Sequence, residues 1–563
     1  MKNHSLLLSF LLLLATFVAI TAQDTKLQYS NPIIPGFNPD PSICRAGNDF
    51  YLVTSTFEYF PGVPVYHSKD LVNWEMIGHV LSRPSQLNLD SMDCSGGIYA
   101  PTIRYNKGIF YMITTLANVK IKGVPRGNFI CTATNPAGPW SEPHWIANAS
   151  GIDPDLFFDD NGKVYYTGNT KPKTQVYPAH RNIWIQELDI QNWKLIGERA
   201  EVLDGSEYYK KGTLDGGIES GLNNYESPHL YKKDGKYYVM IAHGGTGQNH
   251  AVSIWKSDKV FGPYELNPAN PILTHRDLPR ENAITTTGHA DLVETQNGEW
   301  WMVFLGKRPY GGVNHILGRE TFMAPVDWSG TWPVVNPKGK IGRTELTHTR
   351  PNLKEFVPVQ LPAKDEFEGK ELRKEWTFIR TPRTEWWSLS QKKGFLSIQL
   401  RPETINEALN PSFIGKRQEH KNFSATASMQ FTPQKEGEEA GLVVERDKDY
   451  YFKFTLATKN NKTGILLIKN AMLDNKELSF KEIVPIHNKS VFLKINAEGV
   501  FYTFKYSVDG KNWSSVSENV DGRFLGIDAA GRFTGTMLGM YTSSNGVVSK
   551  NYANFDWFEY FGK

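Results

Sequence analysis

Polar turns followed by paired apolar or aromatic residues recur five times along the first 345 residues of the chain. Each turn with its pair is typical of a hairpin that leads into a β-strand. The five instances lie at residues 47–51, 106–111, 161–166, 234–238 and 297–301. We therefore expect five hairpins spread along more than half of the chain.

Two further markers keep the same order around every hairpin. A branched apolar residue, which we call the anchor, precedes each turn, and an aromatic residue follows each hairpin after a second polar turn. The anchors are Ile43, Ile103, Leu156, Leu230 and Leu292, and the aromatic residues are Trp74, Trp140, Trp193, Tyr264 and Trp332. Single glycine turns before aromatic strands occur in unrelated β proteins, but three markers in register five times indicate a repeat. Small all-β units bury their faces by packing radially, so we predict a five-bladed β-propeller over residues 23–345, with long loops.

The pattern changes after residue 345. Residues 346–364 carry three prolines and no clear periodicity, as expected of a linker or a strap along the propeller. Alternation of apolar and polar positions, without helical stretches, then returns in residues 365–563. It is clearest at residues 396–400, 423–431, 452–456, 493–495 and 501–506. We predict an all-β chain in which a β-sandwich follows the propeller.

Composition and charge exclude several classes of protein. Hydrophobic residues make up 40% of the 563 residues, and 15 Trp, 25 Tyr and 31 Phe supply material for a large core, so a disordered chain is excluded. The formal net charge is +3 and no run of like charge stands out, so no nucleic-acid partner is expected. The near-neutral balance suits an uncharged substrate.

The first 22 residues have the order of a secretory signal peptide. Lys2 and His4 precede an apolar run at residues 6–20, and residues 21–23 would form the cleavage region. The run is shorter than the roughly 20 apolar residues that a membrane span needs, although an uncleaved anchor is the alternative interpretation. We therefore expect a secreted or periplasmic protein without a membrane span.

The cysteines and histidines do not indicate a disulfide framework or a zinc site. Cys44, Cys94 and Cys131 are an odd number spread thinly through a long chain, which leaves room for one disulfide pair at most. No CxxC or HExxH motif occurs, and the histidines do not fall at the spacing of zinc ligands. We expect no metal to take part in the chemistry.

Residues just ahead of the anchors are predicted to meet at one mouth of the propeller channel, because the first strand of each blade lines the axis. Asp40, Asp153 and Glu226 occupy three of these five positions, with Glu226 one residue earlier in its blade, and His289 and Tyr99 lie at or beside the other two. Asp before Pro is also a common turn residue, but surface acids would not follow the blade register. Three ionised carboxylates around one axis repel one another, which separates their pKa values and provides an acid and a base. This arrangement suits glycoside hydrolysis.

Several longer motifs carry a resemblance to a known family. They are GFNPDPSI at residues 36–43, STFEYFPGV at 55–63, GIDP at 151–154, ESPHLY at 226–231 and LGRET at 317–321. The chain closely resembles the β-xylosidase and α-L-arabinofuranosidase branch of glycoside hydrolase family 43, whose members also carry a C-terminal concanavalin-like β-sandwich. The resemblance implies an exo-acting, inverting glycosidase that removes terminal α-L-arabinofuranosyl and/or β-D-xylosyl residues from plant cell-wall (hemicellulose) oligosaccharides.

The resemblance also implies roles for the three carboxyl groups. Asp40 would be the general base that activates water, and Glu226 the general acid that protonates the leaving oxygen. Asp153 would be the third carboxylate, which raises the pKa of the acid and orients it. Inversion requires the carboxyl groups of base and acid to lie roughly 6.5 to 9.5 Å apart, so that a water molecule fits between them.

The same matching places four residues around the pocket for the terminal sugar. They are Phe57, Thr246, His289 and Arg319, and Arg319 would donate hydrogen bonds to sugar hydroxyls or, alternatively, form an ordinary ion pair.

Two features of the pocket separate this chain from the family pattern or extend it. Tyr99 stands where β-xylosidases of this branch usually have Trp, so the pocket wall is altered and the choice between arabinofuranose and xylose stays open. In relatives a loop of the sandwich closes the pocket, and we expect Phe533 to lie on that loop here. The sandwich would then restrict the pocket to chain ends.

The resemblance implies no required cofactor. Relatives often hold a water or a structural calcium ion in the channel near His289, and a lone structural histidine is the alternative. An oligosaccharide substrate is the expected partner, and a homo-oligomer is left open. Two other functions are retained: a non-catalytic secreted carbohydrate-binding protein, against which the three carboxylates argue, and a retaining hydrolase of the sucrose type, which the anomer formed first would reveal.

Overall fold

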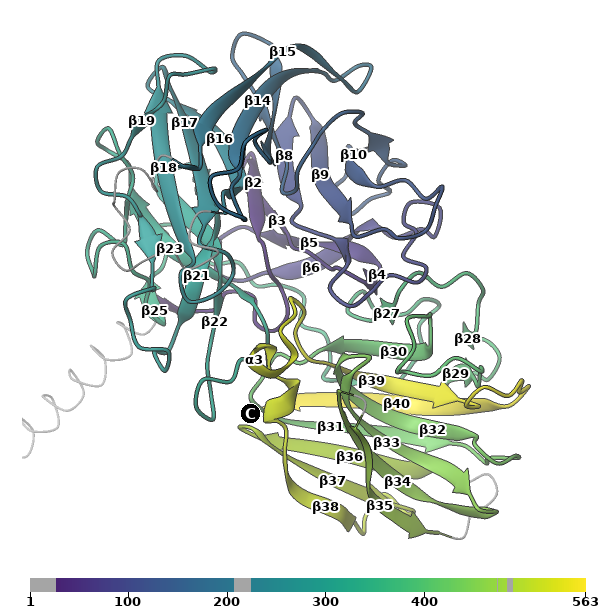
Figure 1. Ribbon diagram of the computed structural model, residues 1–563. Helices are drawn as coiled ribbons and strands as arrows, with labels where there is room; N and C mark the ends of the chain where they lie inside the picture. The colour runs from purple at the N-terminus through teal and green to yellow at the C-terminus, as the bar shows by residue number, and fades with distance from the viewer. Residues whose placement is uncertain (1–26, 207–223, 473, 484–489) are drawn as a thin grey trace, which may run out of the picture.

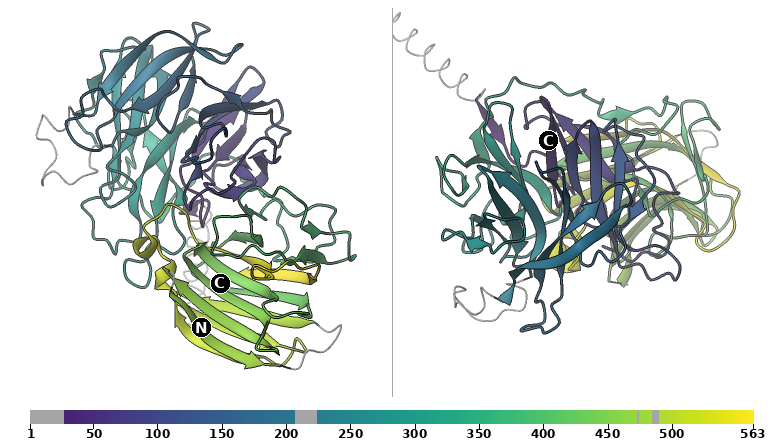
Figure 2. Two further views of the ribbon diagram at one scale, coloured as in Figure 1. Left: turned by 45° about the vertical axis from the view of Figure 1, so that its right-hand side comes forward. Right: turned by 90° about the horizontal axis from the view of Figure 1, so that it is seen from above.

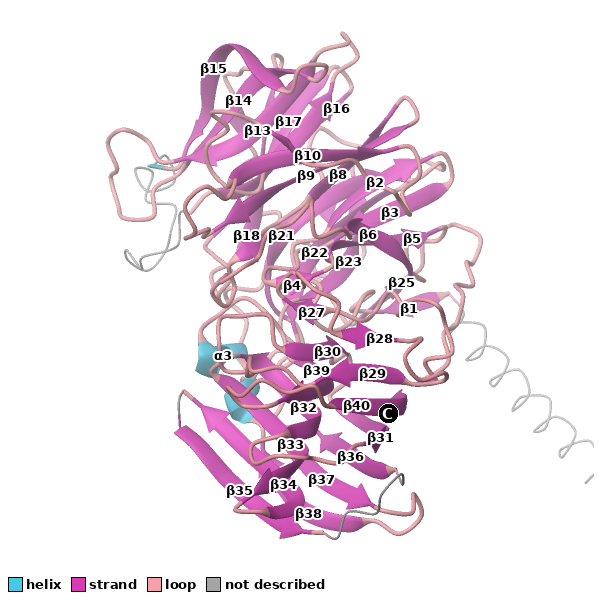
Figure 3. Ribbon diagram, turned by 90° about the vertical axis from the view of Figure 1, so that its right-hand side faces the viewer, coloured by secondary structure: helices cyan, strands magenta, loops and turns pink. Residues whose placement is uncertain are grey.

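The computed structural model describes residues 27–206, 224–472, 474–483 and 490–563, so the predicted signal peptide at residues 1–22 lies outside the described residues. The described chain forms two β bodies, one stacked against the other (Figure 1). Figure 2 shows the same arrangement from two other sides. The colouring in Figure 3 shows how little of the described chain is helical.

The first body is a five-bladed β-propeller. Within the described residues each blade is an antiparallel sheet of four main strands, and each begins with the strand that carries the anchor. The blades are β2 (Ser42–Ala46), β3 (Asp49–Val53), β5 (Gly62–Ser68) and β6 (Glu75–Leu81); β8 (Thr102–Asn106), β9 (Ile109–Ala117), β10 (Gly127–Ala133) and β11 (His144–Trp145); β12 (Asp155–Phe158), β13 (Val164–Thr170), β14 (Asn182–Asp189) and β15 (Lys194–Asp204); β16 (Glu226–Lys233), β17 (Lys236–His243), β18 (Ala251–Ser257) and β19 (Glu265–Leu266); and β21 (Thr285–Glu294), β22 (Trp300–Lys307), β23 (Glu320–Asp327) and β24 (Val334–Val335).

The three sequence markers fall where the blade geometry needs them. Each predicted turn joins the first two strands of a blade, and each marker aromatic lies just before the fourth strand. The second strands are buried along nearly their whole length, as in β22, because neighbouring blades cover both of their faces. Two short strands, β7 (Gly97–Ile98) and β20 (Leu273–Thr274), add to the second and fourth blades.

A short strand pair joins the start of the described chain to the segment after the last blade. β1 (Gln28–Ser30) pairs with β25 (Thr347–Thr349), and the Asn31 side chain exchanges two hydrogen bonds with the backbone of Met323 in blade five. β25 lies within residues 346–364, which the sequence predicts as a linker or strap. A strand of three residues is too short to show a period in the sequence.

The second body is a sandwich of two antiparallel sheets whose facing sides form one large apolar core. In the described residues the first sheet contains β26 (Lys364–Asp365), β28 (Trp387–Ser388), β29 (Leu396–Gln399), β31 (Asn422–Gln430), β36 (Val491–Glu498), β37 (Phe501–Ser507), β38 (Ser514–Asp521) and β40 (Tyr552–Gly562). The second contains β30 (Ser412–Arg417), β32 (Glu439–Asp447), β33 (Tyr450–Lys459), β34 (Lys462–Ala471), β35 (Asp474–Glu482) and β39 (Met537–Ser543).

One helical segment interrupts the sandwich, where the sequence predicts none. A 3-10 turn at Arg523–Leu525 leads into the short helix α3 (Ile527–Ala530), and both lie at the boundary with the propeller (Figure 1). A helix of four residues completes barely one turn, so it leaves no apolar period in the sequence.

The sandwich is attached to the first blade by backbone and side-chain contacts. β27 (Phe378–Ile379) pairs with β4 (Tyr59–Phe60), a strand of the loop that carries Phe57. The Tyr59 hydroxyl donates to Glu445 Oε1 at 2.8 Å, and Arg417 Nε donates to the Phe37 carbonyl at 2.6 Å. The contacts therefore reach the motifs that surround the channel mouth.

Two expectations about the whole chain can be compared with the described residues. All three cysteines are free thiols, so the disulfide pair that the sequence leaves open does not form. No helix in the described residues has the length and apolar content needed to cross a membrane.

Candidate active site

The same backbone kink lies three residues before the anchor in four blades. Asp40, Asp153 and His289 have φ values of 55°, 54° and 50°, and Ser227, which follows Glu226, has a φ of 51°. Residues with a Cβ atom adopt this left-handed region rarely, and such outliers cluster at functional sites. The kink thus recurs at one register position, which Asp40, Asp153 and His289 occupy in their blades and Ser227, next to Glu226, occupies in blade four.

Asp40 is held by a guanidinium and a hydroxyl group. The Asp40 carboxylate is buried and accepts a hydrogen bond from Arg319 Nη1 at 2.6 Å on Oδ1 and one from Ser55 Oγ at 2.5 Å on Oδ2. His289 Nδ1 lies 3.7 Å from Oδ1. These contacts fix the orientation of the carboxyl group, as a general base requires.

Asp153 and Glu226 share an environment that disfavours two charges. Burial, followed by the charges of Glu226 and Asp40, raises the pKa of Asp153 well above its usual value. Burial, followed by the charge of Asp40, raises the pKa of Glu226 to about 7, although Arg319 opposes this shift. Asn224 donates to Glu226 Oε2 at 3.1 Å. The pair therefore retains a proton at a pH where an isolated carboxyl group would have lost it.

Three rings and one guanidinium form a compact cluster beside Asp40. The ring centroid of Phe57 lies 5.2 Å from that of Tyr99 and 5.9 Å from that of Phe533. The guanidinium carbon of Arg319 lies 5.4 Å from the Phe57 ring and 5.5 Å from the Phe533 ring. Asn118 donates to the Tyr99 hydroxyl at 2.7 Å. The structure thus brings together four of the six residues predicted to bind the sugar.

The sandwich contributes directly to this cluster. The Phe533 backbone nitrogen donates to Ser95 Oγ at 2.9 Å, and Arg319 Nε donates to the Phe533 carbonyl at 3.3 Å. The loop approaches the propeller so closely that a Cβ atom on Gly535 would lie 2.4 Å from the Leu317 carbonyl oxygen. Because Arg319 also holds Asp40, the sandwich loop is connected to the predicted base through a single side chain.

Thr246 and His289 occupy different parts of the site. Burial lowers the pKa of His289 to about 4, despite the opposing charge of Asp40, so the ring is neutral at neutral pH and lies against that carboxylate. Thr246 lies further away, and its carbonyl accepts a hydrogen bond from Lys307 Nζ at 2.9 Å. Burial, followed by the charge of Arg319, lowers the pKa of Lys307 to about 7. Lys307 thus contacts Thr246 by a hydrogen bond and is close enough to Arg319 for the two charges to interact.

Several polar residues that hold the site were not anticipated from the sequence. Ser55 lies within a motif that carries the family resemblance, yet a lone serine has no distinctive signal. Ser95 and Lys307 act through contacts that only the folded chain creates. Asn224 lies two residues before Glu226, and that proximity was the one available signal.

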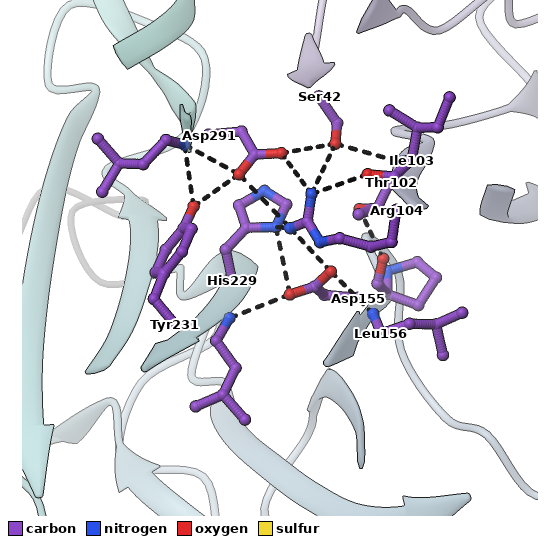
Figure 4. Close-up of polar contacts among 12 residues, drawn as sticks. Ser42, Thr102, Ile103, Arg104, Asp155, Leu156, His229, Tyr231 and Asp291 are labelled. Atoms are coloured by element: carbon purple, nitrogen blue, oxygen red, sulfur yellow. Dashed lines mark hydrogen bonds and ion pairs between the residues drawn. The ribbon is translucent and has the colours of Figure 1, made fainter. Parts of the chain in front are cut away.

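The carboxylate beside His289, where relatives often hold a calcium ion, is that of Asp40, and it is paired with Arg319. Calcium takes oxygen ligands, carboxylates above all. The two carboxylates in the channel below, Asp155 and Asp291, are both paired with the guanidinium of Arg104 (Figure 4). In the described part of the chain, no group of three histidine, cysteine or acidic side chains is placed to hold a metal ion.

Carboxyl groups at the mouth of a β-propeller, beside a cluster of aromatic rings, are the arrangement expected of a glycosidase site. The model of glycosyl hydrolases family 43 matches residues 29–333, and the model of the beta xylosidase C-terminal concanavalin A-like domain matches residues 364–561. The chain belongs to glycoside hydrolase family 43.

Relatives with similar sequences match along their whole length. The chain is 41% identical to the non-reducing end alpha-L-arabinofuranosidase BoGH43B of Bacteroides ovatus over 100% of this chain and 99% of the relative. It is 41% identical to a xylosidase/arabinosidase of Butyrivibrio fibrisolvens over 94% of this chain and 98% of the relative. A solved xylan beta-1,4-xylosidase of Bacillus halodurans superposes with a TM-score of 0.86 at 33% identity and covers 95% of this chain and 100% of its own. The chain is thus an enzyme that hydrolyses glycosidic bonds.

Proposed function

We propose that this enzyme removes terminal α-L-arabinofuranosyl and/or β-D-xylosyl residues from hemicellulose oligosaccharides with inversion of configuration. Asp40 acts as the general base on a water molecule, and Glu226 acts as the general acid on the leaving oxygen. Asp153 keeps the acid protonated by repulsion between the two carboxyl groups. The sugar lies against Phe57 and Tyr99, and Arg319 binds its hydroxyl groups.

The observation that carries this proposal is the contrast between Asp40 and Glu226. Asp40 accepts two short hydrogen bonds, one of them from the Arg319 guanidinium, whereas Glu226 sits in an environment that raises its pKa to about 7. The environments of the two carboxyl groups are thus separated in the way that a base and an acid require. A non-catalytic sugar-binding protein has no use for this separation.

The choice of sugar is supported by the relatives and by the pocket. One relative is named an arabinofuranosidase, another a xylosidase/arabinosidase, and one solved relative is named "Bacteroides ovatus Xyloglucan PUL GH43B". Tyr99 gives the pocket a phenol wall with a polar end, which suits both five-carbon sugars. Side chains of xyloglucan, arabinan and arabinoxylan are therefore the substrates to test.

The test is a product screen combined with the anomer formed first. Nitrophenyl α-L-arabinofuranoside and β-D-xyloside, then oligosaccharides of the three polymers, are incubated with the enzyme, and released monosaccharide is measured. Proton NMR at early times identifies the anomer. Release of monosaccharide of inverted configuration supports the proposal, whereas retained configuration, or internal cleavage without monosaccharide, contradicts it.

We also propose that the protein acts outside the cytoplasm. The support is the order of charged, apolar and small residues at the start of the sequence. Expression of the full chain in a bacterial host, followed by N-terminal sequencing of the protein recovered from the periplasm or medium, checks this. A mature N-terminus near residue 23 is the expected result, and intact protein in the cytoplasm contradicts it.

A further inference from the structure

A second ring of polar side chains lies along the channel, next to the catalytic carboxyl groups. The residue immediately before the anchor is polar in every blade, although it is enclosed by apolar neighbours. The five residues are Ser42, Thr102, Asp155, His229 and Asp291. Figure 4 shows four of them around the Arg104 guanidinium, whereas the Thr102 hydroxyl donates to the Pro154 carbonyl.

The register places this second ring directly behind the first. Ser42, Asp155 and Asp291 each follow a site residue by two positions, and in all three blades the backbone kink falls on the site residue. In blade four the interval is three residues, and the ladder between β16 and β17 shifts register between Glu226 and His229. This irregularity absorbs the extra residue, so both side chains still face the channel.

The guanidinium of Arg104 lies at the centre of the second ring. Arg104 Nη1 donates to Asp291 Oδ2 at 2.7 Å, and Nη2 lies 2.9 Å from Asp155 Oδ1. Nη2 also lies 3.0 Å from His229 Nδ1, and Nη1 donates to Ser42 Oγ at 3.3 Å. The planar fork of a single arginine on blade two therefore contacts residues of the other four blades.

The two carboxylates are satisfied on their remaining oxygen positions as well. Asp291 accepts hydrogen bonds from the hydroxyls of Ser42 and Tyr231, both at 2.6 Å. Asp155 Oδ2 accepts one from the Leu230 backbone nitrogen at 3.0 Å. Each acid thereby ties its own first strand to the first strand of another blade.

The charges of this cluster depend on one another. The side chains of Asp155 and Asp291 are fully buried, and that of Arg104 is 15% exposed. Burial alone would raise the pKa of Asp291, but Arg104 holds it well below the usual range. Removing the guanidinium would leave two buried carboxylates without a cation, and the strands that carry them would have to move apart or take up protons.

We propose that Arg104 is a positioning residue of the glycosidase site, which sets the places of Asp40, Asp153 and Glu226 by bracing the strands that carry them. The inference rests on the proposed function. It is specific to the geometry of the fork, because a lysine keeps the charge but contacts only one of the two carboxylates. A displacement of about 1 Å at a catalytic group costs on the order of 100-fold in rate.

The test compares Arg104→Ala, Arg104→Lys and a matched control. Arg350→Lys is the control, because Arg350 forms an ion pair at 2.8 Å with the buried Asp70, a residue that is not part of the channel cluster. Near-UV circular dichroism reports folding, and kcat and KM are measured on the aryl glycoside that the wild-type enzyme hydrolyses best. Each variant is assayed with low, non-denaturing guanidinium chloride and with the same concentration of sodium chloride.

We expect Arg104→Lys to fold and to lose about tenfold in kcat with KM within about threefold, and Arg104→Ala to lose about 100-fold. Guanidinium, but not sodium, should restore part of the kcat of Arg104→Ala, and Arg350→Lys should stay within about twofold of wild type.

Three results would overturn the positioning role. They are a kcat for Arg104→Lys within about twofold of wild type, a folded Arg104→Ala that guanidinium does not restore, and unfolding of both variants, since the role would then be general stability. If only Arg104→Ala unfolds, the kcat of Arg104→Lys tests the positioning role. An inactive wild-type enzyme contradicts the proposed function instead, so the two failures are distinguishable.

Discussion

The channel ring and the pocket rim of this active site are built in different ways. Asp40 and Asp153 lie three residues before their anchors and Glu226 four residues before its own, all at the starts of first strands and backed by the second ring. The rim residues Phe57 and Phe533 lie on loops from two different bodies of the chain, which meet only in the folded protein. From this comparison we expect the repeat to set the chemistry and the loops to select the sugar.

This difference has a consequence that can be measured. A change in the ring should lower the rate for every substrate, because all of them need the same proton transfers. A change on the rim should alter KM or the ratio between substrates, because it acts on parts of the sugar that do not react.

The largest effect is expected for the base. Asp40→Asn removes the proton acceptor and leaves the side chain nearly the same size, so kcat/KM should fall by about 1,000-fold or more for both aryl glycosides. Initial rates measure this. Asp160→Asn is the control, since it removes an exposed carboxylate on the outer turn of blade three and should have no effect. Near-normal turnover of Asp40→Asn would show that Asp40 is not the general base.

A smaller effect, with a pH signature, is expected for the third carboxyl group. The acid Glu226 works in its protonated form, so activity should fall as the pH rises through its pKa of about 7. Asp153→Asn removes one of the two carboxyl groups that share a proton, so the remaining Glu226 should lose its proton at lower pH, which moves the basic limb of the pH–rate profile to lower pH. At pH 7 the rate should fall by about 10- to 100-fold, and part of it should return at lower pH. A basic limb that stays in place contradicts the role of Asp153.

On the rim, Phe533→Ala should raise KM by about fivefold to tenfold and change kcat by less than about threefold. The variant loses the ring contacts with Phe57 and Arg319, which are worth about 1 kcal/mol each at most sites. Phe533→Leu keeps much of the side-chain volume, so its KM should lie between those of the wild type and Phe533→Ala. A large loss of kcat with unchanged KM would show that the loop acts on the chemistry.

The smallest effect is expected at the pocket wall. Tyr99→Trp enlarges the wall and removes the hydrogen bond from Asn118, so the ratio of kcat/KM between xyloside and arabinofuranoside should change by about threefold to tenfold. Tyr99→Phe removes only the hydroxyl and should keep the ratio within about twofold. Equal losses on both substrates would show that Tyr99 does not select between them.

The sequence predicts the ring better than the rim because the ring follows a period. Asp40, Asp153 and Glu226 could be located by counting from their anchors, and the five blades were confirmed by the fold. Arg319 contacts Asp40 across 279 residues, and no local pattern contains that pairing. Arg319 and Phe533 were therefore expected only through the family resemblance.

The second ring could be predicted from the sequence only in part. Its polar residues before the anchors were visible in the sequence, but Arg104 follows its anchor and reaches Asp291 across 187 residues. Only closure of the propeller brings blade two, blade three and blade five to one point. The strand pair β1–β25 and the helix α3 were not predicted from the sequence, because elements of three or four residues are too short to show a period.

The most direct test of the division between ring and rim is the leaving-group dependence of Glu226→Gln. A dinitrophenyl glycoside needs little help from an acid, whereas an unmodified oligosaccharide needs it fully. The account predicts that Glu226→Gln loses less than about tenfold on the first and about 1,000-fold or more on the second, while Phe533→Ala loses equally on both. An equal loss on both substrates for Glu226→Gln would contradict the claim that the inner strands carry the acid.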